Sequence, residues 1–267
     1  MEESKKESGE EKMEALLSVL QRHPGLSVLV CALMFRVAHR LLQNLPVPKA
    51  VAVDDFRSWK WRNLSVSMVH SLLTGTWAVT CVIISPEMTT SIHSFYTAPA
   101  YMLICISSGY FVQDAGDIIL TGHARGSWEF LIHHVLVLWC FLYSLYSHLY
   151  VAGAVVALFV EVNSVTLHLR LMLKLASQQS SPLYQINKFL NLFTYIVFRL
   201  SAQFYLTYYI VQNYSWMDKG GYFLVTMTLM NTMILIYFYR LLRADFFPRS
   251  RAHRAKWHPQ QCQEVPH

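Results

Sequence analysis

Length and composition exclude an ordinary soluble protein. The chain has 267 residues, of which 54% are hydrophobic and only 14% are charged. A typical soluble domain carries about 25% charged residues, so the composition predicts a membrane protein. The net charge of +6 comes from basic residues at the ends of apolar segments, where they favour anionic lipid head groups. Nucleic acid is therefore not expected as a partner.

The charges divide the chain into two tails and a long apolar region. We assign residues 1–24 to a charged N-terminal tail and 248–267 to a basic cytosolic tail. The first apolar segment, 25–46, is the weakest, because Arg36, His39 and Arg40 follow its apolar stretch. We expect it to span the membrane with arginines that extend to the surface. An interfacial helix or a signal-anchor is the alternative.

Hydropathy predicts the fold class. A membrane-spanning helix needs about 20 apolar residues. The sequence predicts seven such spans, near 26–45, 64–84, 98–120, 128–148, 150–174, 188–213 and 220–242. We therefore expect an all-α protein, a polytopic transmembrane helical bundle in which one N-terminal helix precedes a six-helix core.

The loops predict the orientation of the bundle. Lysines and arginines precede the second span, separate the third from the fourth and the fifth from the sixth, and follow the seventh. The alternate loops hold one lysine in total. Because basic loops stay in the cytosol, the C-terminus is expected there. Trp59 and Trp61, among basic residues at 56–62, indicate an interfacial collar on the same side.

Polar residues recur within the predicted spans, where they are expensive and indicate function. Several share a helix face at three- or four-residue spacing, and antiparallel helices place them at similar depths. We therefore expect one polar cavity that opens towards the cytosolic leaflet. Its candidate residues are His70, Asp114, Asp117, Glu161, His168 and Arg199, together with the adjacent His133 and His134.

Several of these residues also have a purely structural interpretation. Arg199 needs a partner in the membrane, and Glu161 is the nearest acid by depth, so an ion pair is the alternative to ligand binding. For Asp114 and Asp117, the alternative is a position at the edge of the bundle, where the cytosol solvates them. Histidines and carboxylates can bind metals, but no His-x₃-His pair occurs, and the cysteines lack zinc or disulfide spacing. We expect no metal.

The polar motifs resemble a known family. The motifs are GYFVQDAGD at 109–117, WEFLIHH at 128–134, FVEVN at 159–163 and Phe198-Arg199-Leu200. Over roughly residues 50–245 the chain resembles the TRAM-LAG1-CLN8 (TLC) domain family, and within it a subgroup of TLC domain-containing proteins. The resemblance implies a plasma-membrane protein, with the endoplasmic reticulum as the alternative. It also implies control of phospholipid acyl composition and membrane fluidity by limiting polyunsaturated chains, with phospholipids or acyl chains as partners.

The same family includes ceramide synthases, which acylate long-chain bases from acyl-CoA. Their site joins the double histidine to a later His-Asp-x-x-Asp motif. This chain keeps His133 and His134 but reads Val160-Glu161-Val-Asn-Ser164 at the later position, which puts ceramide synthesis in doubt.

Three hypotheses about function therefore remain. The one we favour is a non-enzymatic regulator that binds lipid in the cavity and needs no cofactor. The second is an acyltransferase that takes acyl-CoA as substrate and uses His133 or His134 as general base or acyl acceptor. The third is a transporter, although neither inverted repeats nor broken helices support it. The sequence does not indicate any protein partner.

Overall fold

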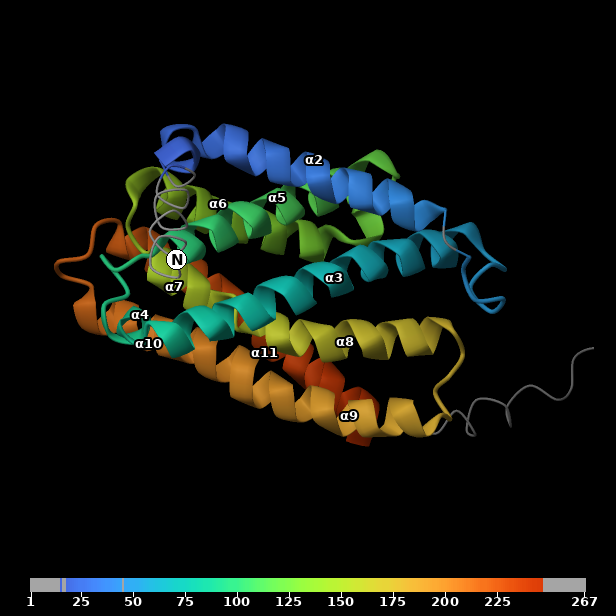
Figure 1. The fold of residues 1–267 in the computed structure, drawn as a ribbon. Helices are drawn as coiled ribbons and strands as arrows, with labels where there is room; N and C mark the ends of the chain where they lie inside the picture. Colours follow the sequence, from blue (N-terminus) through green and yellow to red (C-terminus); the bar gives the residue numbers. More distant parts are fainter. Residues whose placement is uncertain (1–14, 16–17, 45, 247–267) are drawn as a thin grey trace, which may run out of the picture.

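The protein folds into an all-helical bundle (Figure 1), as predicted. The computed structural model describes residues 15, 18–44 and 46–246; the predicted basic tail and most of the predicted N-terminal tail lie outside them. The longest helices are α2 (Pro24–Gln43), α3 (Asp55–Ile84), α5 (Ala98–Leu120), α6 (Trp128–Ser147) and α11 (Gly220–Phe246). The others are α4 (Glu87–Thr90), the 3₁₀ turn η1 (Ala124–Gly126), α7 (Val151–Ala157), α8 (Val160–Leu175), α9 (Pro182–Thr194), the π-helix η2 (Tyr195–Leu200) and α10 (Ser201–Asn213).

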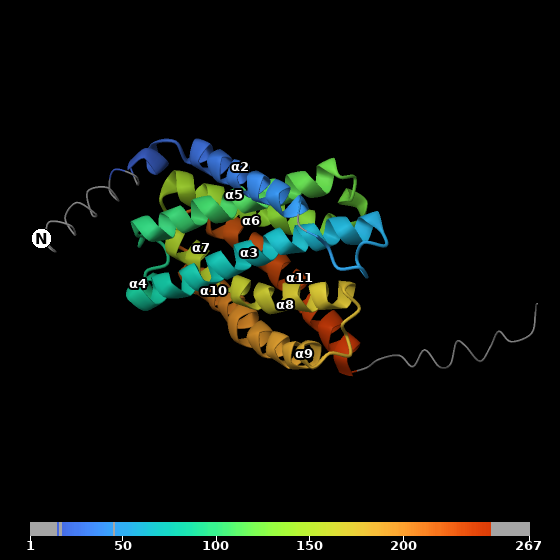
Figure 2. The same ribbon diagram turned by 45° about the vertical axis from the view of Figure 1, so that its right-hand side comes forward.

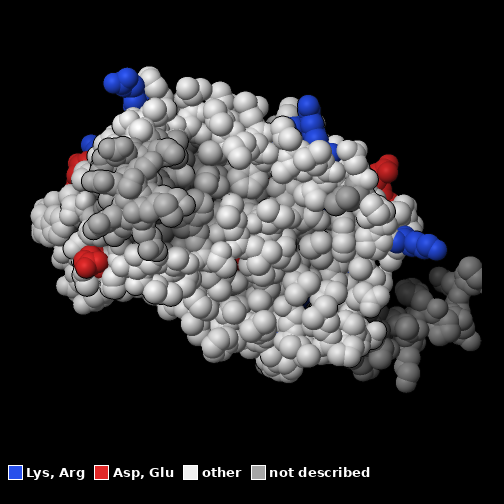
Figure 3. All heavy atoms as spheres, in the orientation of Figure 1, with Lys and Arg blue, Asp and Glu red and all other residues white. Residues whose placement is uncertain are grey.

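The helices have the length and composition needed to cross a membrane. Among the described residues six qualify, namely α2, α3, α5, α6, α11 and the pair α7–α8 taken as one helix. The remaining predicted span corresponds to α9, η2 and α10, which follow one another without a break. On the face drawn in Figure 3, charged side chains lie near the two ends, and a broad, almost uncharged band separates them. Such a band suits contact with lipid, where charges are expensive.

Different helix termini gather at the two ends of the bundle (Figures 1 and 2). We call one the basic end; it holds the start of α3, the turn from α8 to α9 and the end of α11. The opposite end, the α4 end, holds α4, the start of α7 and the turn from α10 to α11. Helix α3 begins at Asp55, well before the predicted residue 64, because the side chain of Asp54 accepts a hydrogen bond from Phe56 N at 3.3 Å. The predicted collar therefore forms the first turns of α3.

Two glycines allow helices to approach closely. Gly109 on α5 faces α2, and a Cβ at this position would lie 2.4 Å from Cys31 Cβ. Gly75 on α3 faces α8, and its Cβ would lie 3.0 Å from Val162 N. Small residues serve this purpose at helix interfaces in membranes. The second contact matters for the candidate site, because it brings α3 against the turn of α8 that carries Glu161.

Apolar and polar cores occupy different parts of the bundle. Near the α4 end, fully buried Tyr101, Leu145 and Val155 belong to one large apolar cluster. The hydroxyl of Tyr101 donates to the carbonyl of Leu145 at 2.9 Å, so even its polar atom is satisfied. Nearer the basic end, the interior positions are taken by histidines, carboxylates and amides, and the candidate site lies there.

Candidate functional site: an intramembrane pocket and its polar walls

A pocket lies between α6, α8, η2, α10 and α11. It encloses about 590 Å³, part of it open to the surroundings. Of the residues predicted to be functional, it is lined by His133, Glu161 and Arg199, and most of its other walls are apolar. A second, mostly apolar pocket of about 470 Å³ lies nearer the α4 end. The two pockets adjoin, because both are lined by Cys140, Phe141, Ala157 and Met227.

Arg199 projects from the π-helical segment η2 towards α8. Its Nε donates to Asn163 Oδ1 at 2.8 Å, and its Nη2 donates to Ser164 Oγ at 2.8 Å and to the carbonyl of Val160 at 3.3 Å. The expected direct ion pair with Glu161 is wrong: within the described residues, all three acceptors are neutral. The physical reason is the rotation of α8, which turns the amide and hydroxyl of its first turn towards η2.

Glu161 is held instead by α3. Its Oε2 accepts a hydrogen bond from Ser71 Oγ at 2.6 Å and lies 3.8 Å from His70 Nδ1. His70 is buried, stacks on the ring of Tyr110 with centroids 3.8 Å apart, and lies with Nε2 3.0 Å from Ser107 Oγ. These contacts fix the inner wall of the pocket, and His70 itself is packed behind that wall.

The two adjacent histidines face different surroundings. His133 lines the pocket, whereas His134 Nε2 lies 3.3 Å from Asp114 Oδ2. The other oxygen of Asp114 accepts a hydrogen bond from Asn63 Nδ2 at 2.6 Å. Successive residues of an α-helix differ by about 100° in direction, so one position reaches the pocket and the next reaches α5.

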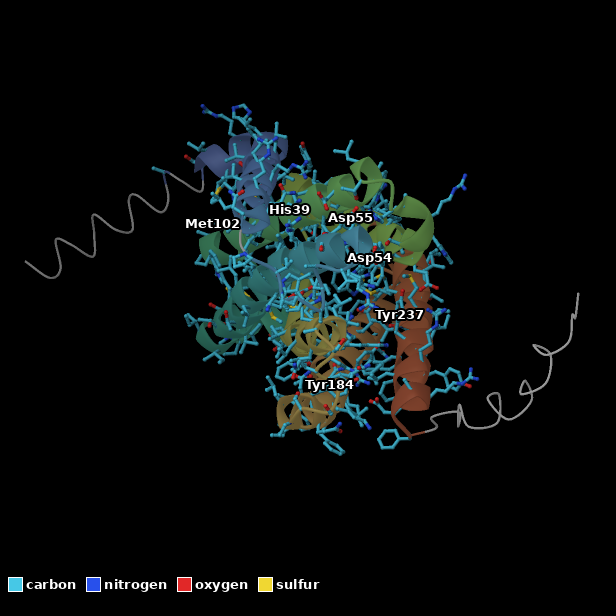
Figure 4. The ribbon with its side chains drawn as sticks, turned by 90° about the vertical axis from the view of Figure 1, so that its right-hand side faces the viewer. His39, Asp54, Asp55, Met102, Tyr184 and Tyr237 are labelled. Carbon is cyan, nitrogen blue, oxygen red and sulfur yellow. The ribbon has the colours of Figure 1, made fainter. Side chains whose placement is uncertain are left out.

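Asp117 forms a second polar centre that includes α2. It accepts hydrogen bonds from Arg36 Nη1 and from Trp59 Nε1, both at 2.9 Å, and His39 Nε2 lies 3.7 Å from it. Asp117 is only 2% exposed, so the alternative of a solvated position at the edge of the bundle is wrong for this residue. Figure 4 looks at the basic end and labels His39, which projects from α2 towards the bundle.

The contribution of α2 was missed from the sequence. Arg36 was interpreted as an arginine that extends to the membrane surface, His39 was given no role, and neither was a candidate. The three-residue spacing between them was the available signal, because it places both side chains on one face of the helix. The partner, Asp117, is 81 residues away from Arg36 along the chain.

A third polar network joins α8 to α9. Asn163 Nδ2 donates to Asn191 Oδ1 at 2.9 Å and to Thr194 Oγ1 at 3.1 Å, while its Oδ1 accepts from Arg199. His168, two turns further along α8 than Glu161, is half-buried, and its Nδ1 has no hydrogen-bond partner among the described residues. The prediction of one polar cavity is therefore correct only in part. The pocket does not include four of the predicted residues, His70, Asp114, Asp117 and His168, which belong to the polar parts of the interior packed around it. In the described part of the chain, no three histidines, cysteines or carboxylates gather as metal ligands.

Polar contacts link α6 to α11 and to the turn that precedes α11. Towards the basic end, Glu129 accepts hydrogen bonds from Tyr237 at 2.7 Å and from Arg240 at 2.9 and 3.1 Å. Towards the α4 end, the carboxylate of Asp218 accepts from Tyr143. Tyr237, labelled in Figure 4, lies one turn beyond Ile234, which lines the pocket.

Comparison with known proteins identifies the family. The model of the TLC domain family matches residues 60–243. This chain belongs to the TLC domain family. It is 40% identical to human TLC domain-containing protein 1 over 227 residues. This aligned region covers 85% of this chain and 92% of the human protein. It is also similar to TLC domain-containing protein 2 from Danio rerio, with 38% identity over 81% of this chain and 88% of the relative.

Human TLC domain-containing protein 2 is more distant, with 32% identity over 83% of both chains. The subgroup indicated by the sequence motifs is therefore that of TLC domain-containing proteins 1 and 2. The chain is a multi-pass membrane protein of a family that is generally related to membrane lipids.

Proposed function

We propose that this protein regulates the acyl composition of membrane phospholipids by binding a lipid in its intramembrane pocket. In this proposal it limits polyunsaturated chains, and thereby adjusts membrane fluidity, without catalysing a reaction. Its site of action is the plasma membrane, with the C-terminus in the cytosol. The similarity to TLC domain-containing proteins 1 and 2 supports a role connected with lipids.

One observation carries the proposal: of two adjoining pockets, one has a polar end and the other is almost entirely apolar. His133, Glu161 and Arg199 lie at the polar end, whereas the second pocket is lined mainly by aliphatic and aromatic side chains. An amphiphile has the matching distribution, with one polar head and a long apolar chain.

The test compares two substitutions on α6 in cells that lack the protein. Val137 lines the pocket, whereas Val135 is 62% exposed on the outer face of the same helix. Val137→Trp fills the pocket, and Val135→Trp adds the same volume where it meets only lipid. We expect loss of the protein to raise the polyunsaturated share of phospholipid chains. Wild type and Val135→Trp should lower this share to its normal level, and Val137→Trp should not.

Lipidomics with matched expression and surface labelling provides the measurement. Equal amounts of both variants at the cell surface separate a blocked pocket from a folding defect. Full restoration by Val137→Trp would contradict the role of the pocket. Depleted ceramide with unchanged phospholipid chains would contradict the proposed lipid class and favour a synthase.

An acyltransferase is the second candidate, and the arrangement of the histidines favours it. His133 reaches the pocket, and His134 lies against the carboxylate of Asp114. A histidine oriented by a carboxylate is suited to general acid–base work, which typically contributes about 10²–10⁴-fold to a rate. In this candidate the acyl group of a pocket-bound acyl-CoA would form an ester with a lysophospholipid hydroxyl, and the proton of that hydroxyl would leave with the released CoA thiol.

Purified protein supplied with acyl-CoA and a lysophospholipid distinguishes the two functions. Catalysis predicts acyl transfer that falls by about 10²–10⁴-fold in His133→Gln or His134→Gln. The binding function that we favour predicts no transfer and a lipid effect in cells that largely survives His133→Gln. Loss of the lipid effect in His134→Gln, at normal abundance and localisation, would overturn our preference.

A further inference from the structure

Arg199 brings to the pocket a positive charge that forms no direct ion pair with any of the described residues. Its three hydrogen bonds go to the amide oxygen of Asn163, the hydroxyl of Ser164 and the carbonyl of Val160. None of the ion pairs formed by described residues includes it. One face of the guanidinium is covered by Tyr195, with Cζ 5.4 Å from the ring centroid. An arginine within a membrane is costly and is normally paired, so its exposure to a pocket requires an explanation.

The surrounding structure holds this arginine in one position. Asn163, which accepts from Nε, is itself fixed by hydrogen bonds from its Nδ2 to Asn191 and Thr194 on α9. The six residues of η2 form a π-helix, which shifts the register of the continuous helix formed by α9, η2 and α10. Single π-turns inside α-helices are rare overall, and those that occur are often found at functional sites. A charge fixed by a second layer of hydrogen bonds is preorganised for a ligand.

Glu161 lines the same pocket but does not neutralise this charge directly. Its Oε2 is held by Ser71 Oγ at 2.6 Å, on the side of α3. Arg199 reaches the pocket from η2, and its contacts on α8 are Val160, Asn163 and Ser164. A ligand anion beside Glu161 would be repelled, so an anion in this pocket should bind on the side of η2.

We propose that Arg199 binds the anionic head group of a single-chain lipid whose chain lies in the apolar part of the two pockets. The group is a carboxylate, as in a free fatty acid, or a phosphate, as in a lysophospholipid. Both accept paired hydrogen bonds from the planar guanidinium, and in an apolar site such charge-assisted bonds are strong. This inference rests on the proposed binding of lipid in the pocket and adds the chemistry of the head group.

Three ligands with the same oleyl-type chain test the head group. Full-length protein in a neutral maltoside detergent is mixed with radiolabelled oleate, oleoyl lysophosphatidate or oleyl alcohol, and binding is measured by scintillation proximity. We expect wild type to bind at least one of the two anions roughly ten- to a hundredfold more tightly than the alcohol. Preference for oleate identifies a carboxylate ligand, preference for lysophosphatidate a phosphate ligand, and equal preference a general anion site.

Variants assign the preference to Arg199. Arg199→Gln should reduce the ratio of anion to alcohol affinity to near one while affinity for the alcohol stays the same. Arg199→Lys should keep part of the ratio, because the charge remains but the paired geometry is lost. Arg243→Gln is the matched control, since Arg243 is exposed near the end of α11 and its replacement removes the same charge.

Failure of this inference is distinct from failure of the proposed function. If wild type binds all three ligands equally, the head-group site is refuted and lipid binding stands. If wild type binds none of them, both are refuted. A preference that survives in Arg199→Gln assigns the anion to another residue and overturns the inference. The comparison in wild type requires no substitution, so a poorly folded variant does not decide the result.

Discussion

The ion pair between Arg36 and Asp117 should anchor α2 to the rest of the bundle. Asp117 on α5 is 2% exposed and accepts from Arg36 on α2 and from Trp59 on α3, both at 2.9 Å. Asp117→Asn keeps the size of the side chain and removes its charge. Arg36 then loses its acidic partner, and the amide offers Trp59 a weaker acceptor. We expect α2 to detach more easily.

The burial of the two partners sets the magnitude. Removing one member of a fully buried ion pair costs about 3–5 kcal/mol, whereas exposed pairs contribute about 0–1 kcal/mol. The side chain of Asp117 is 2% exposed and that of Arg36 is 37% exposed, so the pair lies between these limits. We expect Asp117→Asn to lower the free energy of unfolding by about 2 kcal/mol. For a chain of this size, this corresponds to a fall in melting temperature of roughly 4–8 °C.

A double-mutant cycle with Arg36→Met measures the interaction itself. Thermal unfolding of the purified protein is followed for both single variants and for the double variant. We expect a coupling energy of about 1–2 kcal/mol, because each single variant leaves its partner without a counter-charge. Arg240→Gln is the control: its pair with Glu129 involves an arginine side chain that is 55% exposed, so the loss should stay below about 1 kcal/mol.

Two results would refute this reasoning. If Asp117→Asn has the same melting temperature as wild type, the ion pair contributes nothing to the docking of α2. If the double variant equals the sum of the single variants, the two residues act independently, and the 2.9 Å contact is incidental.

Three further predictions follow from the packing and the topology. Gly109→Val should sharply reduce the yield of folded protein, because even a Cβ would lie 2.4 Å from a side chain of α2. Gly116→Val is the control and should be tolerated, because nothing lies within 4 Å of a Cβ there. Equal yields of the two variants by size-exclusion chromatography would contradict the close approach. Glu161→Gln should fail to rescue the folding of Arg199→Leu, since the two residues form no direct pair; restored yield in the double variant would reinstate that pair. A tag placed after His267 should be reached by antibody only in permeabilised cells, and staining of intact cells would reverse the orientation.

The sequence alone was sufficient for the class of fold and for most helix boundaries. Apolar length and helical spacing are local properties, because each helix satisfies its own backbone hydrogen bonds and presents its apolar surface to lipid. The same three- or four-residue spacing relates Ser67, His70 and Thr74 on α3, and the structure buries all three. The start of α3 was missed because a polar collar lowers hydropathy without ending a helix.

Tertiary structure decided which of the polar residues act together. His133 and His134 are neighbours in sequence, yet one lines the pocket and the other faces Asp114. Arg199 and Glu161 have similar depths, and depth alone suggested a pair, but the rotation of α8 presents Asn163 and Ser164 to the arginine. Partners of this kind depend on how helices rotate and pack against one another. That packing is set by contacts between distant segments, such as Gly109 against Cys31, which no local pattern encodes.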